Sequence, residues 1–227
     1  NSIKKQVKKL IIWPPFISHL KVSSLLSYST YTRHSVWVTK DGRAFCVGFN
    51  EDNRIIDTVD KKTIQNEKEV IIKNKDGHQL KFISAVCGVF YTLYLVQGEN
   101  GGNNQLVFSY SNNSKPLFLK TDNYNPKYLF GGRNTAIAVD GDGAIFVINH
   151  SVLNNPNDEI EAFFLPNDEK PTSIAICQDS VIIVGSKGGI YESSLNTKGI
   201  SRLILLPIKE LEKKQIKEVS GTNDHFL

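Results

Sequence analysis

The stretch STYTRHSVWVTKDGRAFCVGFN, residues 29–50, decides the fold, because the rest of the chain repeats its outline imperfectly. An alternating β-prone run around Trp37 is followed by the turn pair Asp41-Gly42 and by a second β-prone run, residues 44–47. An Asp-Gly pair between two such runs is typical of a tight turn between antiparallel strands. The sequence therefore predicts a β-hairpin here.

The same outline returns along the chain at a spacing of about 45 residues. The residues that mark the successive copies are His34, Tyr91, Asn134, Asp179 and Asp224. Repeats of this length are typical of propeller blades, because one small sheet cannot bury both of its faces and must stack on its neighbours. We therefore predict an all-β propeller of about four blades and the start of a fifth, residues 22–227, after a basic N-terminal segment, residues 1–21.

Three segments outside the marked copies carry predictions of their own. Residues 51–68 are polar and charged, which predicts a long loop or a short helix. Residues 70–86 predict a second hairpin, with a tight turn at Asp76-Gly77. Residues 203–206, the charged run 209–217 and residues 219–227 are together expected to open the fifth blade.

Composition limits the class of the protein. The chain has 227 residues, of which 40% are hydrophobic and 22% charged, so it can bury a core and is not disordered on average. The net charge of +4 is too small to require a nucleic-acid partner. Cys46, Cys87 and Cys177 form no Cys-x-x-Cys pair, so we expect reduced thiols and a cytoplasmic or nuclear location. No apolar run approaches the roughly 20 residues of a membrane-spanning helix, and no membrane partner is predicted.

The repeat resembles that of the regulator of chromosome condensation, a family of seven-bladed propellers. The family unit reads roughly glycine, two residues, His-Ser, an alternating strand, Asp-Gly and a further glycine. The matching residues here are Arg33-His34-Ser35 with Asp41-Gly42, Gly88 with Tyr91-Thr92, Gly131 with Asn134-Thr135 and Asp142-Gly143, and Val219-Ser220-Gly221 with Asp224. Tyr31 and Ile176 stand where the first and fourth copies should have the leading glycine. The resemblance implies a seven-bladed ring, whose remaining blades come from the same protein or from another chain.

The recurring small and polar residues also have a structural explanation that is independent of the family. Glycine before a central strand lets the backbone approach a neighbour near the crowded axis. A hydroxyl or imidazole beside it can satisfy backbone groups there. We therefore interpret the following residues as structural positions of the repeat: His34, Ser35, Gly42, Gly88, Thr92, Gly131, Thr135, Gly143 and Gly221.

The sequence lacks the motifs of a catalytic or metal site. It has no Gly-x-Ser-x-Gly elbow, and its 5 histidines show no metal-ligand spacing. Residues 140–143 resemble the opening of a calcium loop, but its twelfth position is Ser151 rather than glutamate, so we predict a hairpin turn. Residues 98–104 lack the Gly-Lys of a phosphate loop, and we interpret them as a mobile loop and a candidate binding loop. No catalytic residue, metal or cofactor is predicted.

The leading functional hypothesis is a non-catalytic protein-interaction or scaffold module, which needs a protein partner and no chemistry. A purely structural part of a large assembly is a third reading. The alternative implied by the resemblance is guanine nucleotide exchange on a Ran-like small GTPase. In that alternative, chromatin docking would use a basic tail, which a solvated helix or edge strand also explains. The residues of this tail are Lys4, Lys5, Lys8 and Lys9.

An incomplete ring would leave apolar blade faces at its two ends. These faces lie beside Trp37 and around residues 181–184. Exposed apolar faces invite association or aggregation. We therefore expect both to be covered.

Overall fold

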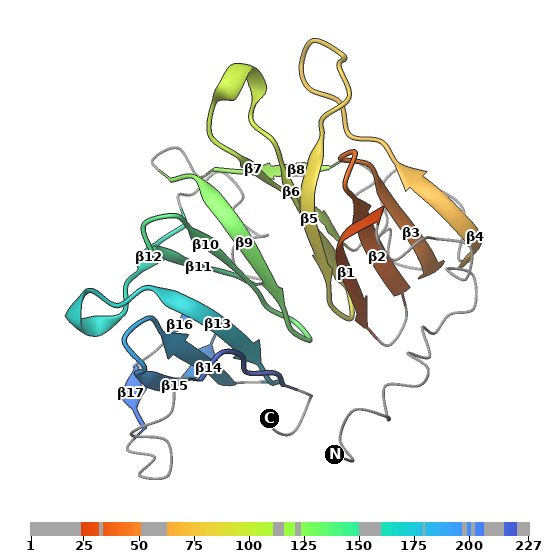
Figure 1. Cartoon of the computed structure of the whole chain (residues 1–227). Helices are drawn as coiled ribbons and strands as arrows, with labels where there is room; N and C mark the ends of the chain where they lie inside the picture. Colours follow the sequence, from red (N-terminus) through yellow and green to blue (C-terminus); the bar gives the residue numbers. More distant parts are fainter. Residues whose placement is uncertain are drawn as a thin grey trace, which may run out of the picture.

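The structure is a computed structural model, and it describes residues 24–31, 34–50, 63–110, 116–120, 124–149, 160–178, 180–196, 199–200, 203–206 and 216–221. Within these residues the chain is almost entirely β, and its strands form four antiparallel sheets. Figure 1 shows the sheets fanned around a common centre in chain order, from the first sheet on the right to the fourth at the lower left. The predicted all-β propeller fold is confirmed.

The first two blades are meanders in which each strand pairs with the next one in the chain. The strands of the first blade are β1 (Leu25–Tyr31), β2 (His34–Thr39), β3 (Ala44–Phe49) and β4 (Thr63–Val70). The strands of the second blade are β5 (Phe82–Cys87), β6 (Tyr91–Val96), β7 (Gln105–Tyr110) and β8 (Leu117–Leu119). A short 3-10 helix, η4 (Glu99–Gly101), lies in the loop between β6 and β7.

The third and fourth blades follow the same order. The strands of the third blade are β9 (Pro126–Gly131), β10 (Ala136–Asp140), β11 (Ile145–Ile148) and β12 (Ala162–Phe163). The fourth blade contains β13 (Pro171–Ile176), β14 (Ser180–Gly185), β15 (Ile190–Asn196), β16 (Gly199–Ile200) and β17 (Ile204–Leu205), and the last two both pair with β15. The 3-10 helix η5 (Pro166–Asp168) lies between β12 and β13.

The hydrophobic cores lie between neighbouring blades. Successive side chains of a strand point to opposite faces of its sheet, so an inner blade contributes to two cores. Pairs of buried residues from the three successive cores are Val36 with Phe82, Leu93 with Phe146, and Ile137 with Ile183. The apolar residues at the two ends are buried as well: Trp37 packs with Val47, and Val181 to Val184 are at most 9% exposed. The residues named for the two ends are therefore buried, although Leu26 and Tyr28 of β1 are 53% and 38% exposed.

The outermost strands differ from the sequence prediction. The loop or helix predicted for residues 51–68 is wrong at its C-terminal end, because β4 begins at Thr63 and pairs with β3; residues 51–62 lie outside the described part. Ile204 and Leu205 complete the fourth blade instead of opening a fifth. An outermost strand has one unpaired edge and faces solvent, so it needs little of the apolar alternation that marks a strand in the sequence.

The hairpin predicted for residues 70–86 is also wrong, although its turn is present. Gly77 has a φ of +84°, and the backbone N–H of Gly77 donates to the oxygen of Asn74 at 3.1 Å. Lys73 and Gln79 form a β-bridge across this loop, but β4 and β5 belong to different blades. The turn therefore lies in a connection between blades.

Gly88 and Gly132 lie where neighbouring blades approach each other most closely. A Cβ atom on Gly88 would lie 2.5 Å from the backbone oxygen of Arg133 in the next blade. A Cβ atom on Gly132 would lie 2.4 Å from Cγ2 of Ile176, again in the next blade. Both distances are too short for any side chain, so only glycine fits without a shift of the blades.

Backbone hydrogen bonds set the alignment of the repeats at these positions. The N–H of Gly132 donates to the oxygen of Thr135 at 2.9 Å, as the N–H of Gly88 does to Tyr91 at 3.1 Å. The position equivalent to Gly88 is therefore Gly132, one residue after Gly131. Cys177 takes this place in the fourth blade, where its N–H donates to Ser180 at 2.9 Å.

Replacing Gly88 should loosen the contact between the second and third blades. We expect Gly88→Ala to lower the free energy of unfolding by about 2 kcal/mol, because the new methyl group meets backbone that cannot move aside. Gly141→Ala is the matched control, since its Cβ would meet only the flexible end of Lys127. Urea unfolding of both variants measures the difference. Equal stabilities would contradict the close approach.

Candidate interaction face

Buried polar side chains join the first blade to the second. His34 Nε2 lies 2.8 Å from Oγ1 of Thr92, and both residues are buried. Ser35 Oγ, next to His34 in β2, lies 2.9 Å from Oγ1 of Thr30. These are three of the polar positions that the repeat pattern singles out, and the structure gives them partners within the protein. The contact between His34 and Thr92 joins the two blades, whereas that between Ser35 and Thr30 lies within the first blade.

Serines of the innermost strands make further bonds between blades, which the repeat pattern does not reveal. Ser29 Oγ accepts a hydrogen bond from the backbone N–H of Cys87 at 3.1 Å. Ser173 Oγ accepts one from the N–H of Val219 at 3.0 Å. Val219 thus lies against the fourth blade much as Cys87 lies against the first. The segment 216–221, which includes Gly221, therefore begins the next position around the ring.

Tyr91 makes the equivalent connection between the second and third blades. Its hydroxyl lies 2.9 Å from the backbone oxygens of both Gly132 and Thr135, and it accepts the N–H of Gly132 at 3.2 Å. Burial raises the pKa of Tyr91 far above its usual value. The phenol therefore stays protonated and acts as a clamp on the neighbouring backbone.

The three cysteines are buried. Burial raises the pKa of the Cys46 thiol to about 12, and it raises that of Cys87 to about 12 as well. A thiol reacts as a nucleophile only in its deprotonated form. Cys46 and Cys87 are therefore poor nucleophiles at neutral pH.

Two lysines pack across turns of the preceding blade. Gly42 in the β2–β3 turn and Gly143 in the β10–β11 turn both have positive φ, +83° and +95°. A Cβ atom on Gly42 would lie 3.2 Å from Cβ of Lys81, and one on Gly143 would lie 3.1 Å from Cγ of Lys170. Lys170 also donates from Nζ to the oxygen of Gly141 at 3.0 Å. The start of each following blade thus rests on a turn of the blade before it.

Asp140 is part of a hairpin turn, as predicted. Its Oδ1 accepts the backbone N–H groups of Asp142 and Ala144, at 2.9 and 2.8 Å. A carboxylate used in this way stabilises the turn. Among the residues that the structure describes, no group of three His, Cys, Asp or Glu side chains could hold a metal ion.

Glu169 holds the turn between β14 and β15. Its carboxylate accepts hydrogen bonds from the Tyr191 hydroxyl at 2.6 Å and from the N–H groups of Lys187 and Gly189 at 3.0 and 3.3 Å. Burial by itself would raise the pKa of Glu169, but these hydrogen bonds outweigh it and leave the pKa below its usual value. Burial and the same carboxylate raise the pKa of Tyr191 to about 12.

The turns between the second and third strands of the blades and the connections between blades leave from one side of the propeller. In an antiparallel meander, the loop between the second and third strands and the connection to the next blade lie at the same end. We call this side the loop face; its described segments are residues 40–43, 71–81, 97–104, 120, 124–125, 141–144, 164–170 and 186–189. Figure 1 shows the second and third of these segments projecting together at the top.

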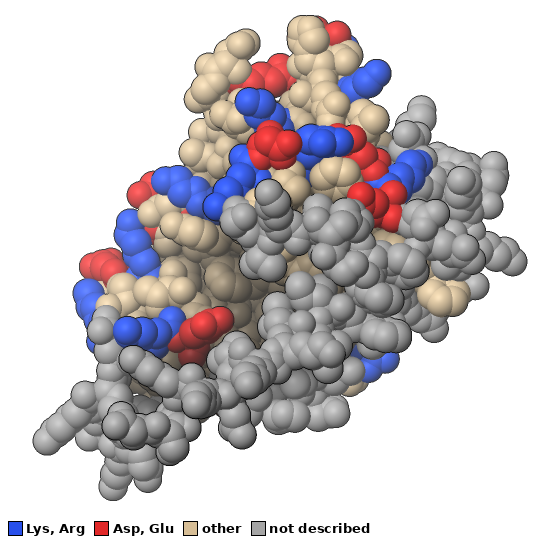
Figure 2. Space-filling model, turned by 45° about the vertical axis from the view of Figure 1, so that its right-hand side comes forward, with Lys and Arg blue, Asp and Glu red and all other residues tan. Residues whose placement is uncertain are grey.

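The loop face combines exposed apolar side chains with charges of both signs. Ile71 and Phe164 each follow the outermost strand of a blade, and they are 42% and 56% exposed. Figure 2 shows lysine and arginine side chains interspersed with acidic ones below the two projecting loops. Mixed charge around apolar side chains is a common composition for a protein-binding surface.

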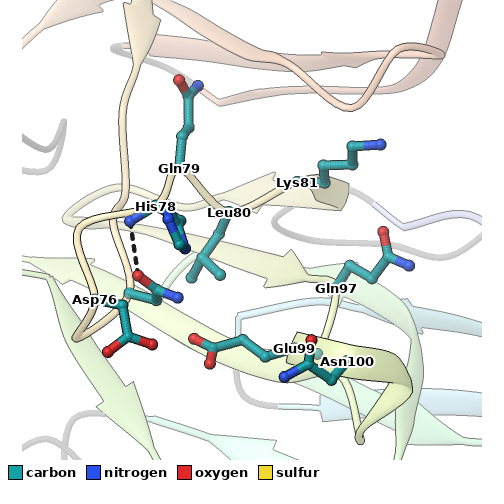
Figure 3. Close-up of a pocket in the computed structure, with 10 residues that line it drawn as sticks. Asp76, His78, Gln79, Leu80, Lys81, Gln97, Glu99 and Asn100 are labelled. Atoms are coloured by element: carbon teal, nitrogen blue, oxygen red, sulfur yellow. Dashed lines mark hydrogen bonds between the residues drawn. The ribbon is translucent and has the colours of Figure 1, made fainter.

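Two loops of this face enclose a cleft of about 330 Å³ above the second blade (Figure 3). The cleft is lined by Asn74, Asp76, His78, Gln79, Leu80, Lys81, Gln97, Gly98, Glu99 and Asn100. It brings together the candidate binding loop 98–104 and the loop between β4 and β5. The two loops lie side by side because the first leads into β5 and the second leaves β6, and these strands pair with Phe82 opposite Val96.

A second hollow lies on the first blade and is lined by Ser24, Thr39, Lys40, Asp41, Arg43 and Phe45. Arg43 donates to both oxygens of Glu69, at 2.8 and 2.6 Å. The same guanidinium lies 4.9 Å from the centre of the Phe45 ring. The Arg43 guanidinium in this hollow is thus already bound by Glu69 and Phe45 of the protein itself.

The described part of the chain contains no helix that is long and apolar enough to cross a membrane. Lys4, Lys5, Lys8 and Lys9, the predicted basic contact, lie outside the described residues.

Removing the Glu169 charge should destabilise the fourth blade in a pH-dependent way. We expect Glu169→Gln to lower the free energy of unfolding by about 1 kcal/mol at pH 7, because Tyr191 and two N–H groups lose a charged acceptor. The folded pKa lies below the unfolded value of about 4.3, so the wild-type advantage holds above that value. It is lost as the pH falls through the folded pKa. Unfolding curves between pH 7 and 3 test this, and a difference that stays constant would contradict it.

Comparisons with known proteins identify the fold. No family model matches this sequence, and no curated protein sequence matches it. Human WBSCR16, a solved structure, is similar with a TM-score of 0.68 at 9% identity, over 88% of this chain and 58% of its own. Prp20p of Saccharomyces cerevisiae, reported with its binding properties to Gsp1p and histones, has a TM-score of 0.61 at 12% identity, over 86% of this chain and 52% of its own.

A further yeast structure shows Kap60 bound to RCC1, also called Prp20. It gives a TM-score of 0.52 at 11% identity, over 93% of this chain and 69% of that one. The present chain spans little more than half the length of WBSCR16 and Prp20p, 58% and 52%. Identities this low speak for the fold alone. The described blades have the repeat fold of the regulator of chromosome condensation propellers.

Proposed function

We propose that this chain is a non-catalytic protein-interaction module and that its loop face is the docking surface. The observation that carries this proposal is a difference between two sets of polar groups. Those in the seams, which are the contacts between neighbouring blades, bond to other groups of the protein, whereas many of those on the loop face are open to solvent. His34, Thr92 and Tyr91, which could serve chemistry elsewhere, are buried and bonded between blades. The loop face instead presents side chains that are open to another molecule, among them Ile71 and Phe164.

Ile71 and Phe164 are the proposed anchors of the contact. Each is a large apolar side chain at the start of a connection between blades. Apolar anchors that become fully desolvated supply most of the binding energy of an interface, while the charges around them select the partner. Two such anchors on loops of different blades favour a partner with an extended surface over a small ligand.

The proposal includes the setting in which the module works. The remaining blades of the ring come from the same protein or from another chain, since the chain spans only part of the propellers it resembles. We place the protein in the cytoplasm or nucleus, because the buried thiols of Cys46 and Cys87 suit a reducing compartment. The contact needs no cofactor or metal, and we expect no direct contact with nucleic acid.

Substitution of both anchors should abolish partner binding without unfolding the blades. We expect Ile71→Ser with Phe164→Ser to reduce the recovery of a co-purifying protein from the native source at least tenfold, because each loses a desolvated apolar contact. Phe90→Ser in the loop between β5 and β6 is the matched control, since Phe90 is 49% exposed and lies at the opposite end of its blade from the loop face. Quantitative affinity capture with the immobilised chain measures recovery. A partner that stays bound to the double variant would refute the loop face as docking surface.

Guanine nucleotide exchange on a Ran-like GTPase is the second candidate, favoured by the fold shared with Prp20p. The expected result is faster release of labelled GDP from Ran when the protein with all of its blades is added. A variant in which Lys4, Lys5, Lys8 and Lys9 are replaced by glutamine separates chromatin docking from exchange. Docking depends on the charge of these lysines, so this variant should lose chromatin binding and keep its rate of GDP release. Release that is no faster than the intrinsic rate would eliminate this candidate.

A further inference from the structure

We propose that the cleft between residues 74–81 and 97–100 binds the guanidinium group of an arginine side chain on the partner protein. This inference rests on the proposed interaction function and names the chemistry that one part of the loop face recognises. It starts from the cleft itself, whose volume of about 330 Å³ is at the lower end for ligand sites. A space of this size suits one long side chain.

The walls of the cleft are rich in hydrogen-bond acceptors. Asp76 and Glu99 contribute carboxylates and Asn100 an amide oxygen, whereas Gln79 and Gln97 point away from both acids in Figure 3. In Figure 3 the Glu99 carboxylate points toward the side of the cleft that holds Asp76, from the opposite loop. Lys81 is the one cation among the residues that line the cleft, and its ammonium group points away from both acids. The cleft thus favours a positively charged occupant with several donors.

The floor of the cleft is apolar. Leu80 is 6% exposed and lies between the two loops in Figure 3. Arginine combines an apolar stem with a planar head that carries five N–H donors. Its stem can pack on Leu80 while its head bonds the acceptors above. Guanidinium fits acceptors on two sides better than the compact ammonium of lysine, because its donors are held in a plane.

Hydrogen bonds hold both loops in place before anything binds. In the first loop, Oδ1 of Asn74 accepts the N–H of His78 at 2.8 Å, which Figure 3 shows as a dashed line. The second loop is tied to the third blade by Asn104, whose Nδ2 donates to the oxygen of Pro126 at 2.8 Å. The N–H of Gln97 donates to the oxygen of Lys81 at 2.8 Å and joins the two loops. Such preorganisation reduces the entropy that binding costs.

Titration with N-acetyl-arginine amide, followed by the backbone amide signals of the nitrogen-15-labelled chain, tests the inference. We expect saturable shifts at Gln97 to Asn100 with a dissociation constant in the millimolar range, as suits a single side chain. The uncharged isostere N-acetyl-citrulline amide should bind at least tenfold more weakly, and N-acetyl-lysine amide at least threefold more weakly. Equal binding of citrulline, or of lysine, would overturn the assignment to guanidinium.

Isosteric variants link the signal to the cleft. Asp76→Asn with Glu99→Gln should weaken arginine binding at least tenfold while the fold stays intact, since both carboxylates are exposed. The control is Asp142→Asn with Glu161→Gln, which removes the same charge from exposed sites elsewhere and should change binding less than twofold. Equal effects of the two double variants would show general attraction to the acidic surface and overturn the inference.

The outcome can be separated from that of the proposed function. The titration needs no partner, so it gives a result even if capture of a partner fails. If arginine does not bind but the partner is still captured through Ile71 and Phe164, this inference falls and the interaction function stands. If arginine binds as expected and the anchor variant retains the partner, the docking surface falls while the cleft remains a guanidinium site.

Discussion

The structure depends on one constraint, which is that a four-stranded sheet with two apolar faces can bury them only against other sheets. Every buried cluster between blades in the described residues takes side chains from two neighbouring sheets. The contact is tightest at Gly88 and Gly132, where a Cβ atom would meet the next blade. Polar bonds at the same depth, such as His34 with Thr92, fix how far one blade slides along the next. Apolar packing holds the blades together, and these hydrogen bonds set the position of one blade relative to the next.

The same seams create the loop face. Lys81 and Lys170 each begin a blade and lie across a glycine turn of the blade before, so a shift of one blade would move the turn of its neighbour. Loops distant in the sequence are thereby held at fixed distances. Residues 74–81 and 97–100 form a cleft because they flank the paired strands β5 and β6 of the second blade. A surface assembled in this way can recognise a partner without first becoming ordered, which favours binding.

The inner strands of each blade could be predicted from the sequence, but the outermost strands could not. Strands such as β6 and β10 are buried on both sides, so their apolar runs and the glycine turns after them identify them. Outer strands face solvent, and β4 reads TIQNEKEV, which is as polar as a loop. The predicted alignment of the third copy is wrong by one residue, because the sequence offers two adjacent glycines, Gly131 and Gly132. Only the hydrogen bond from Gly132 to Thr135 shows which of them is equivalent to Gly88. The cleft depends on the pairing of β5 with β6 and on the course of the two loops beyond these strands, which no motif in the sequence encodes.

The hydrogen bonds between blades determine how one blade packs on the next, but they do not determine how many blades the ring contains. Ser29 bonds the strand that follows in the second blade, and Ser173 bonds Val219 in the same way beyond the fourth. Each bond depends on two adjacent units alone, so the repeat can drift in sequence wherever a local substitute such as Tyr91 preserves the contact. Exposed loop residues such as Asp76 and Glu99 are under no such constraint, whereas Ile72 and Leu80 of the same face belong to the core between the first two blades. A propeller of this type can therefore keep its fold while its loops change, and for that reason binding specificity has to be sought in the loops and not in the repeat.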